Sequence, residues 1–260
     1  DIEAKAEIFC DALFDSLGGK DQFDEVIIDL HRQEKDNPMT NEEAMAILKI
    51  TVKSTDQKKV GRIFTAKIVE LGLANYPGWF SKDSIGSGDP FVLYWPALIE
   101  SNYIKEKVYI DENIIDIVPT NQIDIDQITY DHIISYIPQY EEKELKEIYF
   151  GRLIGTRSGD KGGCANLGVW TKTNRAYSFL YHYLTVDRLK KLLPDLDEYE
   201  IDRYEFTNMN ALNFYVHGIL GDGASSNTRL DALAKSLGEY LRAKIIQVPK
   251  YILEESEEIN

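Results

Sequence analysis

The sequence predicts an α+β fold made of two ferredoxin-like α/β sandwich halves, with mainly antiparallel sheets and helices on one face. Strand-like alternation and helical apolar stripes follow one another in both halves of the chain. The two halves also resemble each other in the rhythm of these elements. A charged stretch, 141–147, separates them, and we place the domain boundary there, between domains 1–140 and 147–260.

In the first half, a helix is expected over 3–17, because its apolar residues form one stripe and Gly18 follows as a stop. Cys10 lies on that stripe and is expected to pack in the core. Strands are expected over 23–31, 44–54 and 90–98, and a helix capped by Ser54 or Thr55 follows the second of them.

The second half reads as a four-stranded, two-helix sandwich. Its expected strands are 147–157, 165–173, 198–206 and 210–220, the last two joined by a tight hairpin. Helices are expected around 176–184 and 187–195, the latter capped by Thr185. A closing helix over 228–245 is indicated by Leu230, Leu233, Leu237 and Leu241.

Composition excludes several classes of partner. The 260 residues carry a net charge of −15, which repels phosphate backbones and makes nucleic acid a poor partner. Apolar runs stay short of the roughly 20 residues that cross a bilayer, and the first residues contain no basic leader. The two cysteines, Cys10 and Cys164, form no disulfide framework, and we expect no metal cluster. We therefore expect a cytoplasmic protein without membrane or nucleic-acid partners.

The stretch "RSGDKGGCANLGVW", 157–170, has the composition of an anion-binding loop. Its glycines permit backbone N–H groups to point inward, and Arg157 and Lys161 add positive charge. The Gly-Lys-Ser/Thr spacing of phosphate loops is missing, which argues against ATP. The alternative is structural: Asp160 pairs with Arg157 or Lys161 and pins a turn, with Asn166 satisfying loop carbonyls. Under both interpretations Arg157 and Asp160 should share one polar cluster.

A second polar loop, "GDGASSN", lies between a predicted strand and the predicted closing helix. Gly221 and Gly223 would expose the first N–H groups of that helix, which attract a carboxylate or phosphate, and Arg229 would reinforce them. The alternative is ordinary capping by Ser226 or Asn227. We expect this turn, 221–226, and the first loop, 158–164, to converge at one end of the second sheet.

Three stretches in order, "RSGDKGGCANLGV", "TNMNALNFYVHGILGDG" and "SSNTRLDALAKSL", resemble the small ferredoxin-fold domain of the acyclic terpene utilisation (AtuA-type) family. The first half is more loosely similar to the last portion of that family's large domain, through "YPGWF" and "PFVLYWPAL". A full-length member would carry a further α/β region ahead of residue 1, and the chain opens on Asp1 rather than Met. One departure is Ala234, which stands where the family pattern favours glycine.

The resemblance implies a role in catabolism of acyclic terpenes or branched acyl chains, without an established catalytic residue. We expect binding of an acyl-CoA or carboxylate metabolite, with a CoA thioester as one substrate class and no cofactor identified. Asp160 and Lys161 are the candidates for proton transfer or carbonyl polarisation. The candidate substrate-binding residues are Arg157, Ser158, Asn166, Asn210, Asn213, Gly221, Gly223, Ser225 and Arg229.

The competing interpretation is a noncatalytic binding or assembly subunit whose motif loops form an interface. A concave pocket lined by both loops would favour a site, whereas burial against a second chain would favour assembly. The sheet of the second half has one face without helices, to which Trp170, Tyr204 and Phe206 add aromatic area. We expect that face to be covered by the first half or by another subunit, and predict a homo-oligomer.

Overall fold

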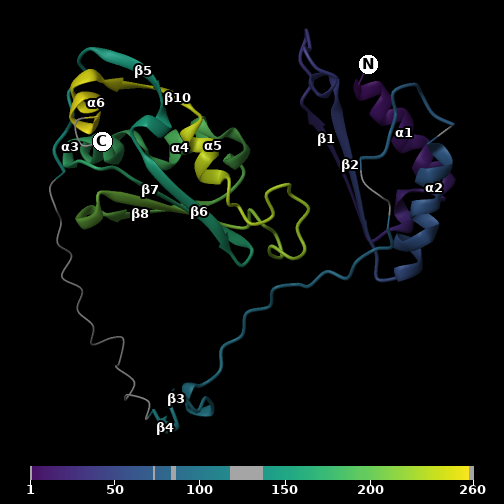
Figure 1. Cartoon of the computed structure of the whole chain (residues 1–260), viewed down its shortest axis with the longest axis horizontal. Helices are drawn as coiled ribbons and strands as arrows, with labels where there is room; N and C mark the ends of the chain where they lie inside the picture. Colours follow the sequence, from purple (N-terminus) through teal and green to yellow (C-terminus); the bar gives the residue numbers. More distant parts are fainter. Residues whose placement is uncertain (1, 73, 83–85, 118–136, 258–260) are drawn as a thin grey trace. The chain divides into compact units, whose positions relative to one another are not determined.

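The computed structural model of the chain describes residues 2–72, 74–82, 86–117 and 137–257. It divides into two compact units, the first unit being Asp1–Phe91 and the second unit Val92–Asn260 (Figure 1). Each unit contains its own cluster of buried apolar side chains. Helices and antiparallel strands occur in both, as the predicted α+β class requires.

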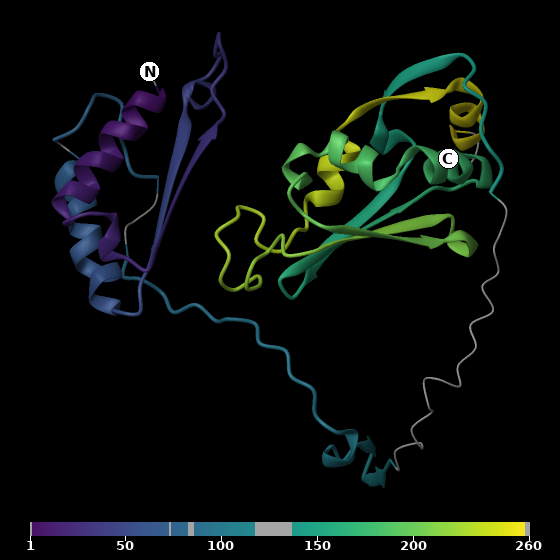
Figure 2. The same cartoon turned by 180° about the vertical axis from the view of Figure 1, so that it is seen from behind.

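The first unit packs two helices against a hairpin (Figure 2). Its elements are α1 (Ile2–Ser16), β1 (Glu25–Arg32), β2 (Ala46–Lys53) and α2 (Phe64–Leu71). The strands pair antiparallel, and Val26 faces Val52 on the side that packs against the helices. The core consists of Phe9, Cys10, Leu13, Phe14, Phe23 and Phe64. Cys10 is buried as predicted, and burial raises the pKa of its thiol.

The predicted cap of the second helix is one or two residues too early. Asp56, rather than Ser54 or Thr55, accepts a hydrogen bond from the Lys58 backbone N–H, at 3.0 Å. The helix then opens with a π-helical stretch, Lys59–Ile63, kinked at Gly61, before α2 begins. The stop after α1 is as predicted, since Gly18 has a φ of +88°.

The strand predicted over 90–98 is wrong. The described backbone there forms no ladder, and the large side chains are exposed, Leu98 completely. Pro90 and Pro96 remove two N–H donors from this stretch, which weakens any strand pairing. A small hairpin follows, with β3 (Lys107–Ile110) paired to β4 (Asn113–Asp116).

The second unit contains the ferredoxin-like sheet. Its strands are β6 (Gly155–Lys161), β7 (Cys164–Trp170), β8 (Ile201–Phe206) and β9 (Ala211–Val216). They are antiparallel neighbours in the order β6-β7-β9-β8. The helices α3 (Asn174–Tyr183), α4 (Val186–Leu192) and α5 (Leu237–Arg242) lie on one face (Figure 1). We call the other face of this sheet the open face.

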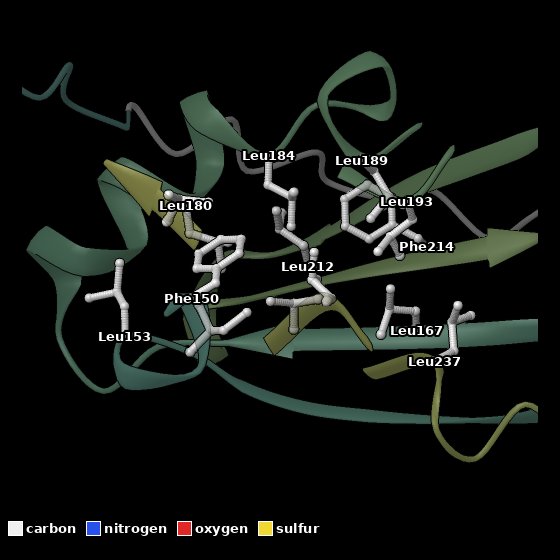
Figure 3. Close-up of a cluster of buried hydrophobic side chains, with 14 of the residues drawn as sticks. Phe150, Leu153, Leu167, Leu180, Leu184, Leu189, Leu193, Leu212, Phe214 and Leu237 are labelled. Atoms are coloured by element: carbon white, nitrogen blue, oxygen red, sulfur yellow. The ribbon is translucent and has the colours of Figure 1, made fainter. Parts of the chain in front are cut away.

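Alternation along the strands builds the core beneath the helices (Figure 3). Leu167 of β7 and both Leu212 and Phe214 of β9 turn toward Leu180 of α3 and Leu189 of α4, and all five are almost fully buried. Burial of each such side chain stabilises the fold by about 1.5–3 kcal/mol. Thr185 caps α4 as predicted, accepting a hydrogen bond from the Arg188 N–H at 3.1 Å.

A single strand over 147–157 is wrong, because a 3₁₀ turn, Phe150–Arg152, divides it. The first part, β5 (Leu145–Tyr149), pairs instead with β10 (Ile245–Pro249), which precedes α6 (Lys250–Glu257). Residues 145–147 of the expected charged connector therefore belong to a strand. Phe150 drives this break, since its side chain is completely buried in the core of the second unit.

The closing helix is also shorter than predicted, because α5 begins only at Leu237. Leu230 and Leu233, which continued the apolar stripe in the sequence, are exposed. Ala234 interrupts the helix by adopting a left-handed φ of +51°. The Asp231 carboxylate then accepts hydrogen bonds from the N–H groups of Lys235 and Ser236, at 2.8 and 2.7 Å, just ahead of α5.

Candidate functional site

The stretch predicted as an anion-binding loop is mostly strand. Residues 157–161 belong to β6, and only Gly162 and Gly163 form the turn into β7. Gly162 has a φ of +63°, as the first position of a tight hairpin turn requires. Inward-pointing N–H groups along this stretch are therefore replaced by the β6–β7 ladder. We call this end of the sheet the hairpin end.

The two polar segments converge at the hairpin end, as predicted (Figure 2). The Leu220 N–H donates to the Gly163 carbonyl at 2.9 Å. A Cβ on Gly163 would lie 2.1 Å from the Gly221 carbonyl oxygen, so this approach requires glycine. Gly221 and Gly223 have positive φ values, +55° and +112°, which give the second loop its path.

Asp160 pairs with Lys235, a residue of the third family-like stretch that the site prediction did not include. The Lys235 Nζ lies 3.2 Å from the Asp160 Oδ1. The hydrogen bond from Lys235 lowers the pKa of the Asp160 carboxyl. The expected cluster of Arg157 with Asp160 is wrong, because residues three apart on a strand point to opposite faces. Lys161 donates to the backbone carbonyl of Asp160 at 2.9 Å, not to its carboxylate.

Ser158 and Gly159 position Lys235 from the strand side. The buried Ser158 hydroxyl donates to the Lys235 carbonyl at 3.1 Å and accepts from the Gly238 N–H at 3.0 Å. Because the Ser158 hydroxyl uses both hydrogen bonds on backbone groups of 235–238, it fixes the backbone at the start of α5. A Cβ on Gly159 would lie 2.8 Å from the Lys235 Nζ, so the missing side chain makes room for the ammonium. Because β6 is an edge strand, the Lys235 side chain can pass the edge of the sheet and approach both Asp160 and Gly159.

The open face carries Arg157 and two asparagines. The register aligns Arg157, Gly168 and Asn213 across three strands, and it aligns Gly159 with Asn166 in the next row. The Asn166 Nδ2 donates to the Asn213 Oδ1 at 3.2 Å. Gly159 and Gly168 add no side chain to this surface, so the area that they leave is flanked by the guanidinium of Arg157 and the side-chain amides of the two asparagines. Arg157 is exposed there.

A chain of polar side chains continues along the open face, and sequence reasoning missed it. The His217 Nε2 lies 2.9 Å from the Asp202 Oδ2, and the Tyr204 hydroxyl donates to the same oxygen at 3.3 Å. A hydrogen bond with Cys164 raises the pKa of the Tyr215 hydroxyl. The predicted hairpin could have indicated these contacts, because pairing β8 with β9 sets Asp202 opposite Tyr215 on one face of the sheet.

Asn210 lies apart from this cluster, and Arg229 has a partner outside it. Asn210 stands in the turn between β8 and β9, at the other end of the sheet, where its Nδ2 donates to the Asn174 Oδ1 at 3.0 Å. The Arg229 guanidinium lies 3.7 Å from the Asp195 carboxylate. Ser225 is exposed in the second loop. Asn210 is therefore separated from the side chains around Asp160, and the ion-pair partner of Arg229 is Asp195 rather than a residue of that cluster.

The helix N-terminus expected after Gly223 is wrong, because no helix begins there. Asn227 instead holds the loop together, donating from its Nδ2 to the carbonyls of Gly223 and Ala232, both at 3.0 Å. Ser226 is buried and donates to the Gly223 carbonyl at 3.3 Å. Both side chains thus fix the loop through bonds within it. This resembles the alternative of capping by Ser226 or Asn227, except that no helix begins after them.

Within the described residues, no group of His, Cys, Asp and Glu side chains could hold a metal ion. The same part of the chain contains no helix with the length and apolar character needed to cross a membrane. A groove of about 1220 Å³ lies in the second unit. Neither polar loop lines it, and Asn210 is the predicted site residue among its lining.

The sheet, its one helical layer and the convergence of the polar segments define the second unit as a ferredoxin-like α+β domain. Residues 148–247 match the AtuA ferredoxin-like domain, and residues 1–110 match the acyclic terpene utilisation family protein AtuA. Together these matches cover most of the chain, which belongs to the AtuA family of acyclic terpene utilisation. No curated protein and no solved structure matches the chain.

Proposed function

We propose that the protein acts in the cytoplasmic catabolism of acyclic terpenes or branched acyl chains, and that its hairpin end binds an acyl metabolite. The bound group is the carboxylate of a free acid or the thioester end of an acyl-CoA. One observation carries the proposal: the first family-like stretch contacts the other two, through Asp160 with Lys235 and through Asn166 with Asn213.

Local charge supports binding of an anion or a polarised carbonyl. Arg157, Lys161 and Lys235 gather around one short strand in a chain whose net charge is −15. Arg157 can donate two parallel hydrogen bonds to a carboxylate or phosphate, and the amides of Asn166 and Asn213 lie on the same face. The binding part of the site is therefore the open face beside Gly159 and Gly168.

Asp160 and Lys161 supply the proposed chemistry. Asp160 stays ionised because Lys235 pairs with it, and the lowered pKa makes its carboxylate a weak base, so its proposed part is to hold the Lys235 ammonium where that group can polarise a substrate carbonyl. Lys161, exposed at the end of β6, offers an ammonium that can polarise a carbonyl oxygen. Lys235 contacts the Asp160 carboxylate and also lies beside Gly159, which links this pair to the open face.

A second candidate function, a noncatalytic assembly subunit, is favoured by aromatic side chains on the same face. Trp170, Tyr204 and Phe206 are 41%, 50% and 42% exposed. Exposed aromatic surface of this kind marks many protein interfaces. The open face would then form an interface between copies of the chain.

A thermal-shift screen tests the binding proposal. The protein is titrated with branched acyl-CoA thioesters and with the matching free acids. A bound ligand raises the melting temperature by mass action. R157A and K235A should each weaken binding by about tenfold or more, since each removes a charged hydrogen-bond donor. K191A, which removes an exposed lysine from α4, is the matched control.

An equal shift in R157A, K235A and wild type would contradict the assigned site. No shift with any thioester or acid, together with a multimeric mass in light scattering, would support the assembly subunit instead.

A further inference from the structure

The open face carries a histidine that can serve as the base which the hairpin end lacks. The lowered pKa of Asp160 makes that carboxylate a weak base. His217 directly follows β9, where side chains alternate and Val216 is buried, so the imidazole points away from the core. Its backbone N–H donates to the Glu200 carbonyl at 3.0 Å, which continues the pairing of β9 with β8. His217 therefore shares the open face with Arg157.

A carboxylate orients this histidine. The His217 Nε2 lies 2.9 Å from the Asp202 Oδ2, and the Tyr204 hydroxyl donates to the same oxygen at 3.3 Å. The Tyr215 ring packs edge-on against the imidazole, with ring centroids 4.9 Å apart. Among the described residues, none bonds to the other ring nitrogen, Nδ1. An imidazole held by a carboxylate at one nitrogen can take up and release a proton at the other.

Lys161 lies in the same row of the sheet as His217. The register pairs Lys161 with Cys164, and the pairing of β7 with β9, continued by one residue, sets Cys164 beside His217. The Gly218 N–H donates to the Cys164 Sγ at 3.4 Å, in keeping with this approach. With about 4.8 Å between neighbouring strands, the Cα atoms of Lys161 and His217 stand about 10 Å apart. Their two side chains can therefore reach one acyl carbonyl between them.

Tyr94 adds an aromatic ring beside this row. The residue belongs to the second unit, where its backbone N–H donates to the Asp222 carbonyl at 3.1 Å. A Cβ on Gly162 would lie 2.8 Å from the Tyr94 Cε1, so the glycine makes room for the ring. The pKa of Tyr215 is raised mainly by its hydrogen bond with Cys164, and the nearby Tyr94 phenol adds to that rise. The apolar chain of an acyl group can contact this ring.

We propose that His217 is the catalytic base of the open face and that Asp202 is its positioning residue. This inference rests on the proposed function and narrows the substrate to an acyl thioester with a hydrogen on the carbon beside its carbonyl. The Lys161 ammonium holds the carbonyl oxygen, and the His217 Nδ1 takes that hydrogen as a proton. The C–H bond breaks, its electron pair forms a carbon–carbon double bond, and the carbonyl π pair moves to the oxygen to give an enolate. Return of a proton from His217 restores the thioester, so the step needs no oxidant or further reactant.

A thioester suits this step better than a free acid. In the acid, a second negative charge would develop beside the carboxylate, whereas the thioester carbonyl is neutral. The side chains of His217 and Asp202 are 40% and 45% exposed, so a ligand can reach the imidazole and water can exchange its proton. In heavy water, reversible removal of the proton should therefore replace the hydrogen with deuterium.

Deuterium exchange tests the inference. The full chain is incubated in heavy water with 4-methylpentanoyl-CoA, a branched thioester with a CH₂ group beside its carbonyl, and proton nuclear magnetic resonance follows the loss of the CH₂ signal. Wild type should accelerate this loss. H217Q should slow it about 100-fold or more, since a positioned base contributes at least that much, while thermal shift still reports bound thioester.

Two further variants separate a role in catalysis from a role in folding. D202N should lower the exchange rate at saturating thioester about tenfold or more, without changing the thioester concentration that gives the half-maximal rate. D197N, at an exposed aspartate between α4 and β8, is the matched control and should exchange at the wild-type rate. Added imidazole should restore part of the exchange in H217A, which it could not do for a misfolded chain.

Three results would overturn the inference. Equal exchange rates in wild type and H217Q would remove the base, and an unchanged rate in D202N would remove the positioning role of Asp202. Thioester binding by wild type without any exchange would overturn the inference and leave the proposed binding function standing. Absence of both binding and exchange would overturn the inference and the proposed function together.

Discussion

Ala234 is the residue at which the chain departs from the family pattern, and the structure gives that departure a physical meaning. Its φ of +51° lies in the left-handed region, where a Cβ costs roughly 1 kcal/mol, and its side chain is buried. Glycine adopts this conformation without that cost. The resemblance alone therefore located a strained turn that no apolar pattern revealed.

A234G should raise the free energy of unfolding by no more than about 0.5 kcal/mol, because the relief of about 1 kcal/mol of strain is largely offset by the greater backbone freedom of unfolded glycine and by the loss of the buried methyl group. Urea denaturation measures the change. A232G, two residues earlier and outside the left-handed region, should be neutral or destabilising. A loss of stability in A234G would show that the φ of this residue is not strained.

Asp231 is expected to make stability depend on pH. Burial opposes its ionisation, but hydrogen bonds from the Ser236 hydroxyl and from backbone N–H groups hold the pKa of its carboxyl below the usual value. A carboxyl with a lowered folded-state pKa stabilises the fold fully above its unfolded pKa, about 3.9. That contribution is lost as the pH falls through the folded-state pKa.

D231N should therefore lower the free energy of unfolding by about 1–2 kcal/mol at pH 7, through the weakened hydrogen bonds. The difference from wild type should shrink when the pH is lowered below about 4. Urea titrations at several pH values measure both. A difference that stays constant down to pH 3 would contradict the assigned role.

At the scale of elements, α5 depends on a close approach to β6. Gly238 is buried in that helix, and a Cβ there would lie 2.6 Å from the Thr156 Oγ1. Helix propensity alone favours alanine over glycine by about 1 kcal/mol. The close contact should outweigh that preference. The Cβ of Thr156 would also lie only 2.9 Å away, and this atom is fixed to the backbone of β6, which cannot move without disturbing the sheet.

G238A should therefore destabilise the protein by about 1–3 kcal/mol, as overpacked core positions do. Chemical denaturation followed by far-ultraviolet circular dichroism measures it. E239A, at the exposed next position of α5, should change stability by less than about 0.5 kcal/mol. A stabilising G238A would mean that the helix sits further from β6.

The elements that sequence reasoning found were those with local signals. The apolar stripe and Gly18 predicted α1, and Thr185 predicted the start of α4. The closing helix was overextended because Leu230 and Leu233 continue the stripe of Leu237, although Ala234 has already turned the chain. Periodicity reports where apolar residues recur, but not whether the backbone between them is helical.

The candidate site was predicted only in part for a related reason. Convergence of the two polar segments followed from the strand order, and it is confirmed by the contact of Gly163 with Leu220. The partner of Asp160 could not be read from the sequence, since Lys235 follows 75 residues later and reaches β6 only through tertiary packing. Nothing in the local pattern distinguished it from other lysines.

At the scale of the whole molecule, the open face is the proposed surface for self-association. Trp170 and Phe206 share one row of the sheet with Ala211, and Tyr204 stands in the next row. Light scattering at micromolar concentration should give a multiple of the single-chain mass. W170E, which places a charge in this row, should shift the mass toward a single chain while circular dichroism stays unchanged. A single-chain mass for wild type would remove the proposal.

The placement of the two thiols has a practical consequence for how the molecule can be studied. Cys10 is buried in the first unit, whereas Cys164 stands half-buried in the second unit. Each unit thus carries one chemical reporter of its own opening, distinguishable by peptide mass after alkylation. Rates of alkylation at the two thiols, measured in one sample under native conditions, would show whether the two units open independently or as one cooperative body.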